Sequence, residues 1–159
     1  MATNTLADLY VEQLKDLYSA EQQILKALPK MVKAANHDEL RTAFQTHLAQ
    51  TREHVARLDH IFEALAKSPM GVTCQGMQGI IEEGGELMKA DDADPAVLDA
   101  GLISSAQHVE HYEMVGYGSV RTWAQQLGYE EQAGLLRQTL DEEKEIDAIL
   151  TRLAEQFVV

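Results

Sequence analysis

Cysteine is nearly absent from this chain. Cys74 is the single cysteine among 159 residues, so no disulfide can form within the chain. That absence fits a reducing compartment, and we expect a cytoplasmic protein. The N-terminus has no basic region followed by an apolar run, so it does not predict a signal peptide. No apolar stretch approaches the length of a membrane-spanning helix, so a membrane partner is not expected.

Positive charge is also scarce. Lys and Arg number 13 against 26 Asp and Glu, which gives a formal net charge of −13. Nucleic acids and anionic lipids bind through clustered positive charge, so this composition argues against both as partners. An acidic chain attracts cations instead, although acidity by itself indicates only solubility.

Apolar residues recur every three or four positions through nearly the whole chain, and this spacing predicts helices. Thr5 and Asp8 resemble a capping box, so a first long helix is expected from near Thr5 to about Ala34. Pro29 lies within this helix and can bend it. Asp38 follows a predicted turn and can cap a second helix.

The second half of the chain repeats this pattern after a long connection. The second helix ends before Ser68, because Pro69 disfavours a helical residue in front of it. Asp94 and Pro95 then form the clearest helix start in the chain, and Gly128 can end that helix. The remaining helices are expected over 74–89, which is short and rich in glycine, from Pro95 to about 127, and over about 129–157.

Four long helices with two short turns and one long connection predict an all-α fold. The short turns pair neighbouring helices as antiparallel hairpins, and the long connection lets the chain cross the bundle. We therefore expect a ferritin-like antiparallel four-helix bundle, with a short extra helix between the second and third long helices. No linker divides the chain, so residues 1–159 are predicted to form one domain.

Four carboxylates stand on the apolar stripes of these helices, where leucine or isoleucine is expected. A buried charge must be neutralised, paired or bound to a metal. Two divalent cations carry four positive charges, and hard oxygen ligands with some imidazole suit iron or manganese. The pattern therefore predicts a dimetal site of Fe or Mn whose acids come from three helices: Glu21, Glu110 or Glu113, and Glu143.

The second helix supplies no such acid. It offers His54 as a ligand or a neighbour of one, with Gln50 one turn before it on the same face. On the last helix, Asp147 lies one turn after Glu143 and is a further candidate. The Glu-x-x-His motif of known dimetal bundles is absent, because no histidine of the chain has glutamate three residues before it.

Two other interpretations of these acids stay open. Each acid can lie at the edge of its stripe, hydrogen-bonded to a histidine or to one of Tyr18, Tyr112, Tyr117 and Arg57. The acids can also be protonated in a metal-free core, with pKa values raised by burial. His108 and His111, which flank Glu110, are expected to be solvated.

Five segments of the chain resemble the YciF-like group of bacterial ferritin-like stress proteins. They are LYSAEQQILKALPKM, HLAQTREHVARL, CQGMQGIIEEGGEL, SSAQHVEHYEMVGYGSVRTWAQQLG and QTLDEEKEIDAILTRLAE, and together they run from about Thr5 to Ala154. The stretches AQHVEHYE and LDEEK are the most specific. The resemblance implies a ferritin-like bundle, a homodimer, a dimetal centre, a cytoplasmic location and a role in general stress.

The resemblance places the inward acids of the family on the same four glutamates. It also exposes a departure: where family members carry HLEET, this chain carries HLAQT, so Gln50 replaces glutamate. A glutamine carbonyl can coordinate a metal but supplies no charge. His54, or Glu53 after a small rotation of the helix, is a candidate to compensate.

Two functions follow from these observations. The first is a non-haem dimetal protein that oxidises Fe(II) or handles oxygen or peroxide, with Tyr18 or Tyr112 as a hydrogen-bond partner of the ligands. The second is a catalytically inactive structural or interaction protein that keeps the bundle and binds metal weakly. Gln50 and the missing Glu-x-x-His motif favour the second.

Overall fold

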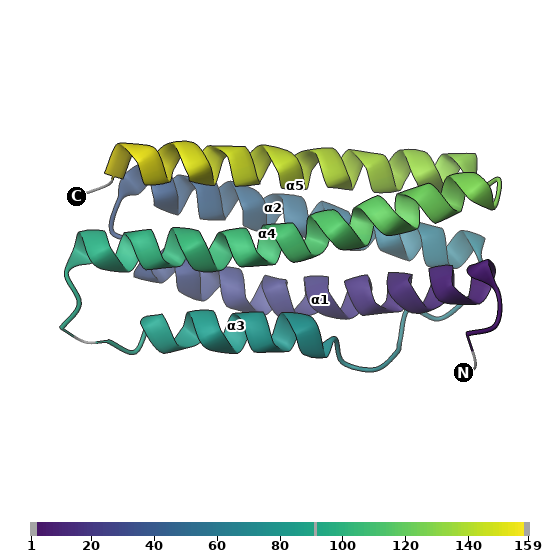
Figure 1. The fold of residues 1–159 in the computed structure, drawn as a ribbon, viewed down its shortest axis with the longest axis horizontal. Coiled ribbons are helices and arrows are strands. Elements are labelled where there is room, and N and C mark those ends of the chain that lie inside the picture. The colour runs from purple at the N-terminus through teal and green to yellow at the C-terminus, as the bar shows by residue number, and fades with distance from the viewer. Residues whose placement is uncertain (1–2, 91, 158–159) are drawn as a thin grey trace.

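The computed structural model describes residues 3–90 and 92–157, so the remaining five residues of the predicted domain 1–159 lie outside the description. The described chain forms five helices and no strand: α1 (Leu6–Ala34), α2 (Asp38–Ala64), α3 (Gln75–Leu87), α4 (Pro95–Gln126) and α5 (Glu130–Phe157). The four long helices run along one axis, and the short α3 lies beside one half of them (Figure 1). The predicted all-α fold is confirmed.

Two of the helix starts are those that the sequence predicts. The Thr5 hydroxyl accepts from the Asp8 amide at 3.1 Å, and the Asp8 carboxylate accepts from the Thr5 amide at 3.0 Å, which completes a capping box. Asp94 caps α4 by accepting from the Ala96 amide at 2.9 Å, and Pro95 is the first helical residue.

The start of α2 differs from the prediction. His37 is the N-cap, and its ring nitrogen Nδ1 accepts from the Glu39 amide at 3.3 Å. Asp38 is instead the first helical residue and pairs with Arg41 one turn later. The ring takes the capping position because Nδ1 can reach the free amide at the helix start as a carboxylate would.

The bundle closes as the ferritin-like topology requires. The helices α1 and α2 pack as one antiparallel hairpin, and α4 and α5 as the other. The two hairpins meet through α1 against α4 and α2 against α5. The connection from α2 to α4 carries α3, which packs on α1 and α4 (Figure 1). None of the described helices is both long and apolar enough to span a membrane.

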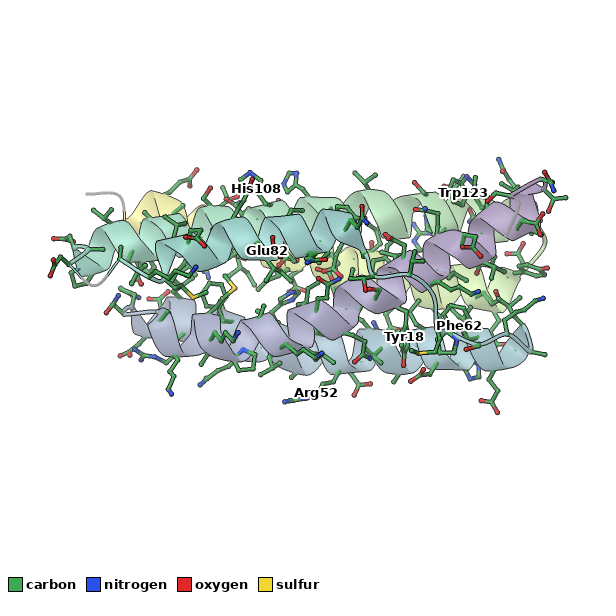
Figure 2. The ribbon with its side chains drawn as sticks, turned by 90° about the horizontal axis from the view of Figure 1, so that it is seen from below. Tyr18, Arg52, Phe62, Glu82, His108 and Trp123 are labelled. Atoms are coloured by element: carbon green, nitrogen blue, oxygen red, sulfur yellow. The ribbon has the colours of Figure 1, made fainter. Side chains whose placement is uncertain are left out.

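The core of the bundle consists of two apolar halves. One half lies around the first turns of α1 and includes Tyr10, Leu14, Leu58, Phe62, Val120 and Leu136. The other lies around the last turns of α1 and includes Leu28, Phe44, Met77, Leu102 and Leu150. Tyr18 packs edge to face on Phe62 with ring centroids 6.1 Å apart, beside the first half (Figure 2). Buried acids and histidines stand on the same four long helices at positions between these two halves.

Candidate metal centre

Six acidic and imidazole side chains lie buried between the two core halves, and each is at most 2% exposed. Four of them are the predicted glutamates, and α2 adds two histidines. They are Glu21 of α1, His47 and His54 of α2, Glu110 and Glu113 of α4, and Glu143 of α5. The sequence places acids on three helices, and the structure brings side chains from all four long helices together.

His54 joins two of the acids in a first group. Its ring nitrogen Nδ1 lies 2.9 Å from Oε1 of Glu143 and 3.3 Å from Oε1 of Glu21. Each of the three residues offers one atom within 4.8 Å of the others. This spacing suits ligands that share one cation.

A second group stands beside the first and shares Glu143 with it. It consists of His47, Glu110, Glu113 and Glu143, whose ligand atoms again lie within 4.8 Å of one another. The His47 nitrogen Nε2 is 3.1 Å from Oε1 of Glu110. Because Glu143 belongs to both groups, its carboxylate is placed to bridge two cations.

The polar atoms of this cluster test whether metals fit it. Both oxygens of Glu113 and of Glu143 have no hydrogen-bond partner among the described residues, and neither has Nδ1 of His54. The short contacts of His54 to Glu143 and of His47 to Glu110 therefore lack hydrogen-bond geometry. Buried polar atoms are nearly always paired in folded proteins. Four carboxylates and two imidazoles with free lone pairs fit two divalent cations of the iron or manganese type.

A layer of hydrogen bonds surrounds the ligands. The His54 nitrogen Nε2 lies 2.9 Å from Oε2 of Glu142, and Glu142 accepts from both terminal nitrogens of Arg57, at 2.7 and 2.9 Å. The Tyr117 hydroxyl donates to Oε1 of Glu21. A proton held on Nε2 by Glu142 leaves Nδ1 of His54 free to face the cluster.

The carboxylates have widely different proton affinities. Burial and the negative charges of Glu143 and Glu21 raise the pKa of Glu113 well above its ordinary value. Burial and Glu143 do the same for Glu110. Burial acts in the same direction on Glu143, but its close polar contacts with Glu110 and His54 and the charge of the nearby imidazoles lower its pKa to about 2. Like charges this close cannot all ionise without a cation.

The pKa values of the two histidines are shifted in opposite directions. Burial lowers the pKa of His47, and the charges of Glu143 and Glu21 offset only part of this effect. Burial also opposes charge on His54, but its carboxylate neighbours Glu143 and Glu21 raise its pKa to about 10. Metal-free protein therefore holds a proton on His54 at neutral pH, and a metal at Nδ1 has to displace it.

We expect metal-free protein to lose about 1–3 kcal/mol of unfolding free energy between pH 7 and pH 9. Folded His54 stays protonated in this range while the unfolded chain does not, and the raised pKa values of Glu110 and Glu113 act with the same sign. His47 has the opposite sign, but its contribution changes only as the pH falls below its ordinary pKa of 6.5. Urea unfolding in chelator at both pH values measures the difference. Equal stability at pH 7 and pH 9 would contradict the protonated cluster.

Three residues that the sequence offers as ligands, Gln50, Glu53 and Asp147, belong to neither of the two groups. Gln50 is half-buried, and its Oε1 is buried without a partner among the described residues, at the edge of the cluster's helix face. Asp147 accepts from Gln107 and lies 3.2 Å from the exposed ring of His111, so it stands at the rim between α4 and α5. Glu53 is exposed, and the proposed rotation that would turn it inward is wrong for this structure. Neighbouring positions on a helix differ by about 100°, and His54 already occupies the inward direction.

Two residues of this region, His47 and Glu142, are not among those predicted from the sequence. His47 was not proposed, although it precedes His54 by seven residues, two helical turns on the same face, and this spacing is a signal in the sequence. Glu142 was overlooked because it adjoins the stronger candidate Glu143. Of the tyrosines predicted as hydrogen-bond partners of the acids, Tyr117 donates to Glu21, whereas Tyr112 donates to Asp16 at 2.8 Å. His108 points away from the bundle, as expected (Figure 2).

Comparison with known proteins agrees with the helical fold. Residues 5–159 match the family described as Domain of unknown function (DUF892). The chain is 41% identical to protein YciF of Escherichia coli K12 over 155 aligned residues. The alignment covers 97% of this chain and 93% of YciF. The crystal structure of the E. coli stress protein YciF superposes with a TM-score of 0.93 at 40% identity, over 98% of both chains.

Two further solved structures share the fold. YcfI of Rhodopseudomonas palustris has a TM-score of 0.89 at 39% identity, over 95% of this chain and 98% of YcfI. A ferritin-like, diiron-carboxylate protein of Bacillus anthracis has a TM-score of 0.73 over 97% of this chain and 99% of that one. The identity to the second is 15%, so this likeness concerns the fold alone.

Proposed function

The chain belongs to the DUF892 family, and we propose that it is a ferritin-like dimetal-carboxylate protein that binds two iron or manganese ions. The shared carboxylate of Glu143 is the observation that carries this proposal, because it joins two groups that each contain a histidine and a further acid. Four carboxylates balance two divalent cations, and their unpaired oxygens favour the same conclusion.

Each ligand has a distinct role in this proposal. Glu21 and His54 would hold one ion, His47, Glu110 and Glu113 would hold the other, and Glu143, which belongs to both groups, would contribute to both. Gln50 takes the place of an acid and adds at most a neutral oxygen. Two bound iron ions would supply electrons one at a time to oxygen or peroxide.

The residues around the cluster would control protons. Glu142 is partly exposed and lies between Arg57 and the buried His54, so it is placed to keep a proton on Nε2 of His54 and to leave Nδ1 directed at the ions. Burial opposes the charge of Glu142, but Arg57 and His54 lower its pKa, which keeps it ionised as an acceptor for that proton. Tyr117 holds Glu21 through its hydroxyl and fixes that carboxylate toward the ions.

The biological setting is part of the same proposal. YciF is described as a stress protein, and removal of Fe(II) or peroxide is a protective reaction that suits such a setting. We place this protein in the cytoplasm as a homodimer, which light scattering coupled to size exclusion would test. A mass of one chain, 17.7 kDa, would contradict the dimer.

Metal stoichiometry and Fe(II) oxidation test the function together. We expect about two Mn(II) or Fe(II) ions per chain in equilibrium dialysis, because the cluster holds two ligand groups. Under air, the loaded protein should oxidise Fe(II) about tenfold faster than buffer, since a fixed metal pair removes much of the entropy cost of assembling the reactants. Absorbance at the ferric band follows the rate. Fewer than one ion per chain would overturn the proposal.

The alternative is a structural or interaction protein that keeps the bundle but lacks redox activity. Gln50 favours it, because the family's acid at this position is replaced and its carbonyl oxygen is left without a partner among the described residues. The oxidation assay separates the two functions. Binding of two ions with an Fe(II) oxidation rate equal to that of buffer would favour this alternative.

A further inference from the structure

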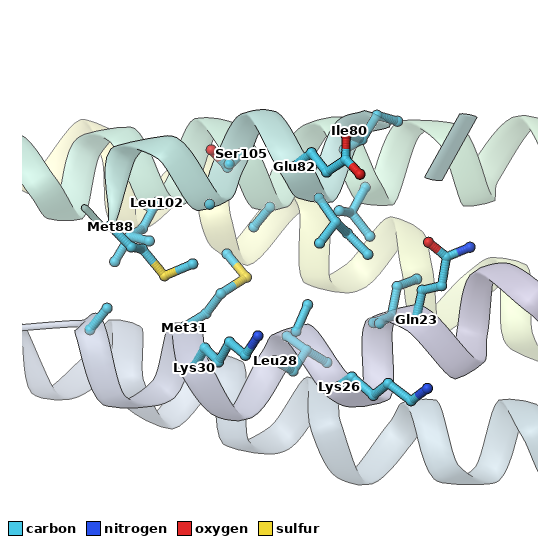
Figure 3. Close-up of a pocket in the computed structure, with 18 of the residues that line it drawn as sticks. Gln23, Lys26, Leu28, Lys30, Met31, Ile80, Glu82, Met88, Leu102 and Ser105 are labelled. Carbon is cyan, nitrogen blue, oxygen red and sulfur yellow. The ribbon is translucent and has the colours of Figure 1, made fainter. Parts of the chain in front are cut away.

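A pocket of about 820 Å³ lies between α1, α3 and α4 (Figure 3). Its walls are mainly apolar: Leu28, Met31, Ile81, Met88, Leu102 and Ala106. Met31 of α1 and Met88, the C-cap of α3, reach toward each other across it (Figure 3). Pockets of this size, lined by apolar side chains with a few polar groups, typically bind small molecules. The thioether side chains can adapt to a flexible ligand.

The pocket reaches the candidate metal centre. His47 and Glu110 are among its lining residues, and both are almost fully buried. On α1 the lining begins at Gln23, two residues after Glu21, and continues to Ala34. One end of the pocket therefore lies beside the metal ligands, and the other lies about 16 Å away at the end of α1, since a helix rises about 1.5 Å per residue.

Positive charge gathers along this pocket in an otherwise acidic chain. Four of the seven lysines of the sequence line it, and three of them are exposed on one face of α1: Lys26, Lys30 and Lys33. None of these three has a carboxylate within 4.0 Å among the described residues. Lys89, just after α3, pairs with Glu86, and on α3 Glu82 accepts from Gln78. Lys30 and Lys33 thus leave positive charge at the end far from the metal ligands.

We propose that this pocket binds a long-chain fatty acid, with its carboxylate at Lys30 and Lys33 and its methyl end beside Glu110 and His47. An extended chain advances about 1.2 Å per bond, as an extended peptide does, so about 16 Å accommodates about 13 bonds. Myristate has this length. The apolar walls match its chain, and the unpaired lysines match its head group. Binding itself does not require the metals; only the end-on approach to the site rests on the proposed function.

Calorimetric titration of metal-free full-length protein with myristate, below its micelle concentration, tests the binding. We expect one saturable site in the micromolar range. Hexanoate should bind more than about 1,000-fold more weakly, because each buried methylene contributes about fourfold in affinity. Tetradecyltrimethylammonium has the same chain length but a positive head group. It should bind at least about tenfold more weakly than myristate. Equal binding of the two head groups, or no saturable binding of myristate, overturns the proposal.

Two variants with matched controls locate the site. The triple change Lys26→Gln, Lys30→Gln, Lys33→Gln should weaken myristate binding about tenfold. The same changes at the three lysines outside the pocket, Lys15, Lys67 and Lys144, should leave it unchanged. Ala27→Phe, in the wall, should abolish binding, and Ala148→Phe, exposed on α5, should not. Circular dichroism checks that each variant folds. Equal effects of pocket and control variants contradict the assignment, as does a dimer that closes the pocket and excludes myristate.

The orientation is tested separately with Mn(II), whose paramagnetism broadens nearby nuclear resonances. Myristate labelled with ¹³C at its methyl carbon should lose its signal when Mn(II) is added, while carboxyl-labelled myristate should lose less. Stronger broadening at the carboxylate overturns the orientation. Myristate binding to a protein that takes up no Mn(II) would contradict the proposed function and leave the pocket assignment standing. Binding of two Mn(II) ions without binding of myristate would contradict the pocket assignment and leave the proposed function standing.

Discussion

Glu143→Gln is expected to weaken metal binding at both positions by about 100-fold or more. Loss of a residue that only orients a ligand weakens metal binding about 10- to 100-fold, and loss of a bridging ligand should have at least that effect. Glu143 belongs to both ligand groups, and it is the acid whose pKa is lowered to about 2, so it is ionised before any metal arrives. The amide keeps the size of the side chain but removes the charge and half of the oxygen ligands. Equilibrium dialysis with Mn(II) measures the effect.

The matched control is Glu145→Gln, which makes the same change of charge two residues further along α5. Glu145 is exposed and outside both ligand groups, so its replacement should leave stoichiometry and affinity unchanged. Loss of one ion with retention of the other in Glu143→Gln would show that the carboxylate serves a single position. Unchanged binding in that variant would remove Glu143 from the centre.

Glu113→Leu should have the second large effect, which is on stability. It should stabilise the metal-free protein and reduce the stabilisation that bound metal provides. Glu113 is fully buried, neither of its oxygens is paired among the described residues, and three neighbouring carboxylates oppose its ionisation. An apolar side chain of similar volume removes this unpaired buried polar group, so metal-free protein should gain about 1–3 kcal/mol of unfolding free energy. A chain of this size should then melt about 3–10 °C higher in chelator.

The same substitution should remove the stabilisation that metal provides. Wild-type protein gains stability from Mn(II) because the ions bind the folded chain alone, by about 4 kcal/mol at 1,000 times the dissociation constant. Glu113→Leu loses a ligand, and its melting temperature should respond little to Mn(II). The control is Glu113→Gln, which removes the charge but leaves a buried polar group, and should gain less in chelator. A lower melting temperature for Glu113→Leu in chelator would contradict the account of a strained acidic cluster.

Stability and metal binding therefore oppose each other at the layer between the two core halves. Glu110 and Glu113 weaken the metal-free bundle, since burial and neighbouring carboxylates disfavour their charged forms. The two apolar halves on either side supply the stability that keeps the acids in place. This opposition predicts that metal binding, folding and protonation are linked in one equilibrium.

Local spacing in the sequence is sufficient to predict the helices and part of the buried cluster of acids and histidines. The capping residues Thr5 and Asp94 depend on hydrogen bonds within one turn, so they are visible without any tertiary contact. The inward direction of Glu21, Glu110 and Glu143 follows from the leucines and alanines that share their helix faces, because positions three and four apart point the same way. These features belong to single helices.

Other features required the packed structure. Whether Glu53 or His54 faces inward depends on the rotation of α2 about its axis, which packing against α1 and α5 decides. His47 becomes a candidate ligand because Glu110, 63 residues later in the chain, lies against it. The pocket exists because α3 covers α1 and α4, with wall residues from all three helices. Distances between separate helices are fixed by how side chains fill the space between them, and no spacing along one helix carries that information.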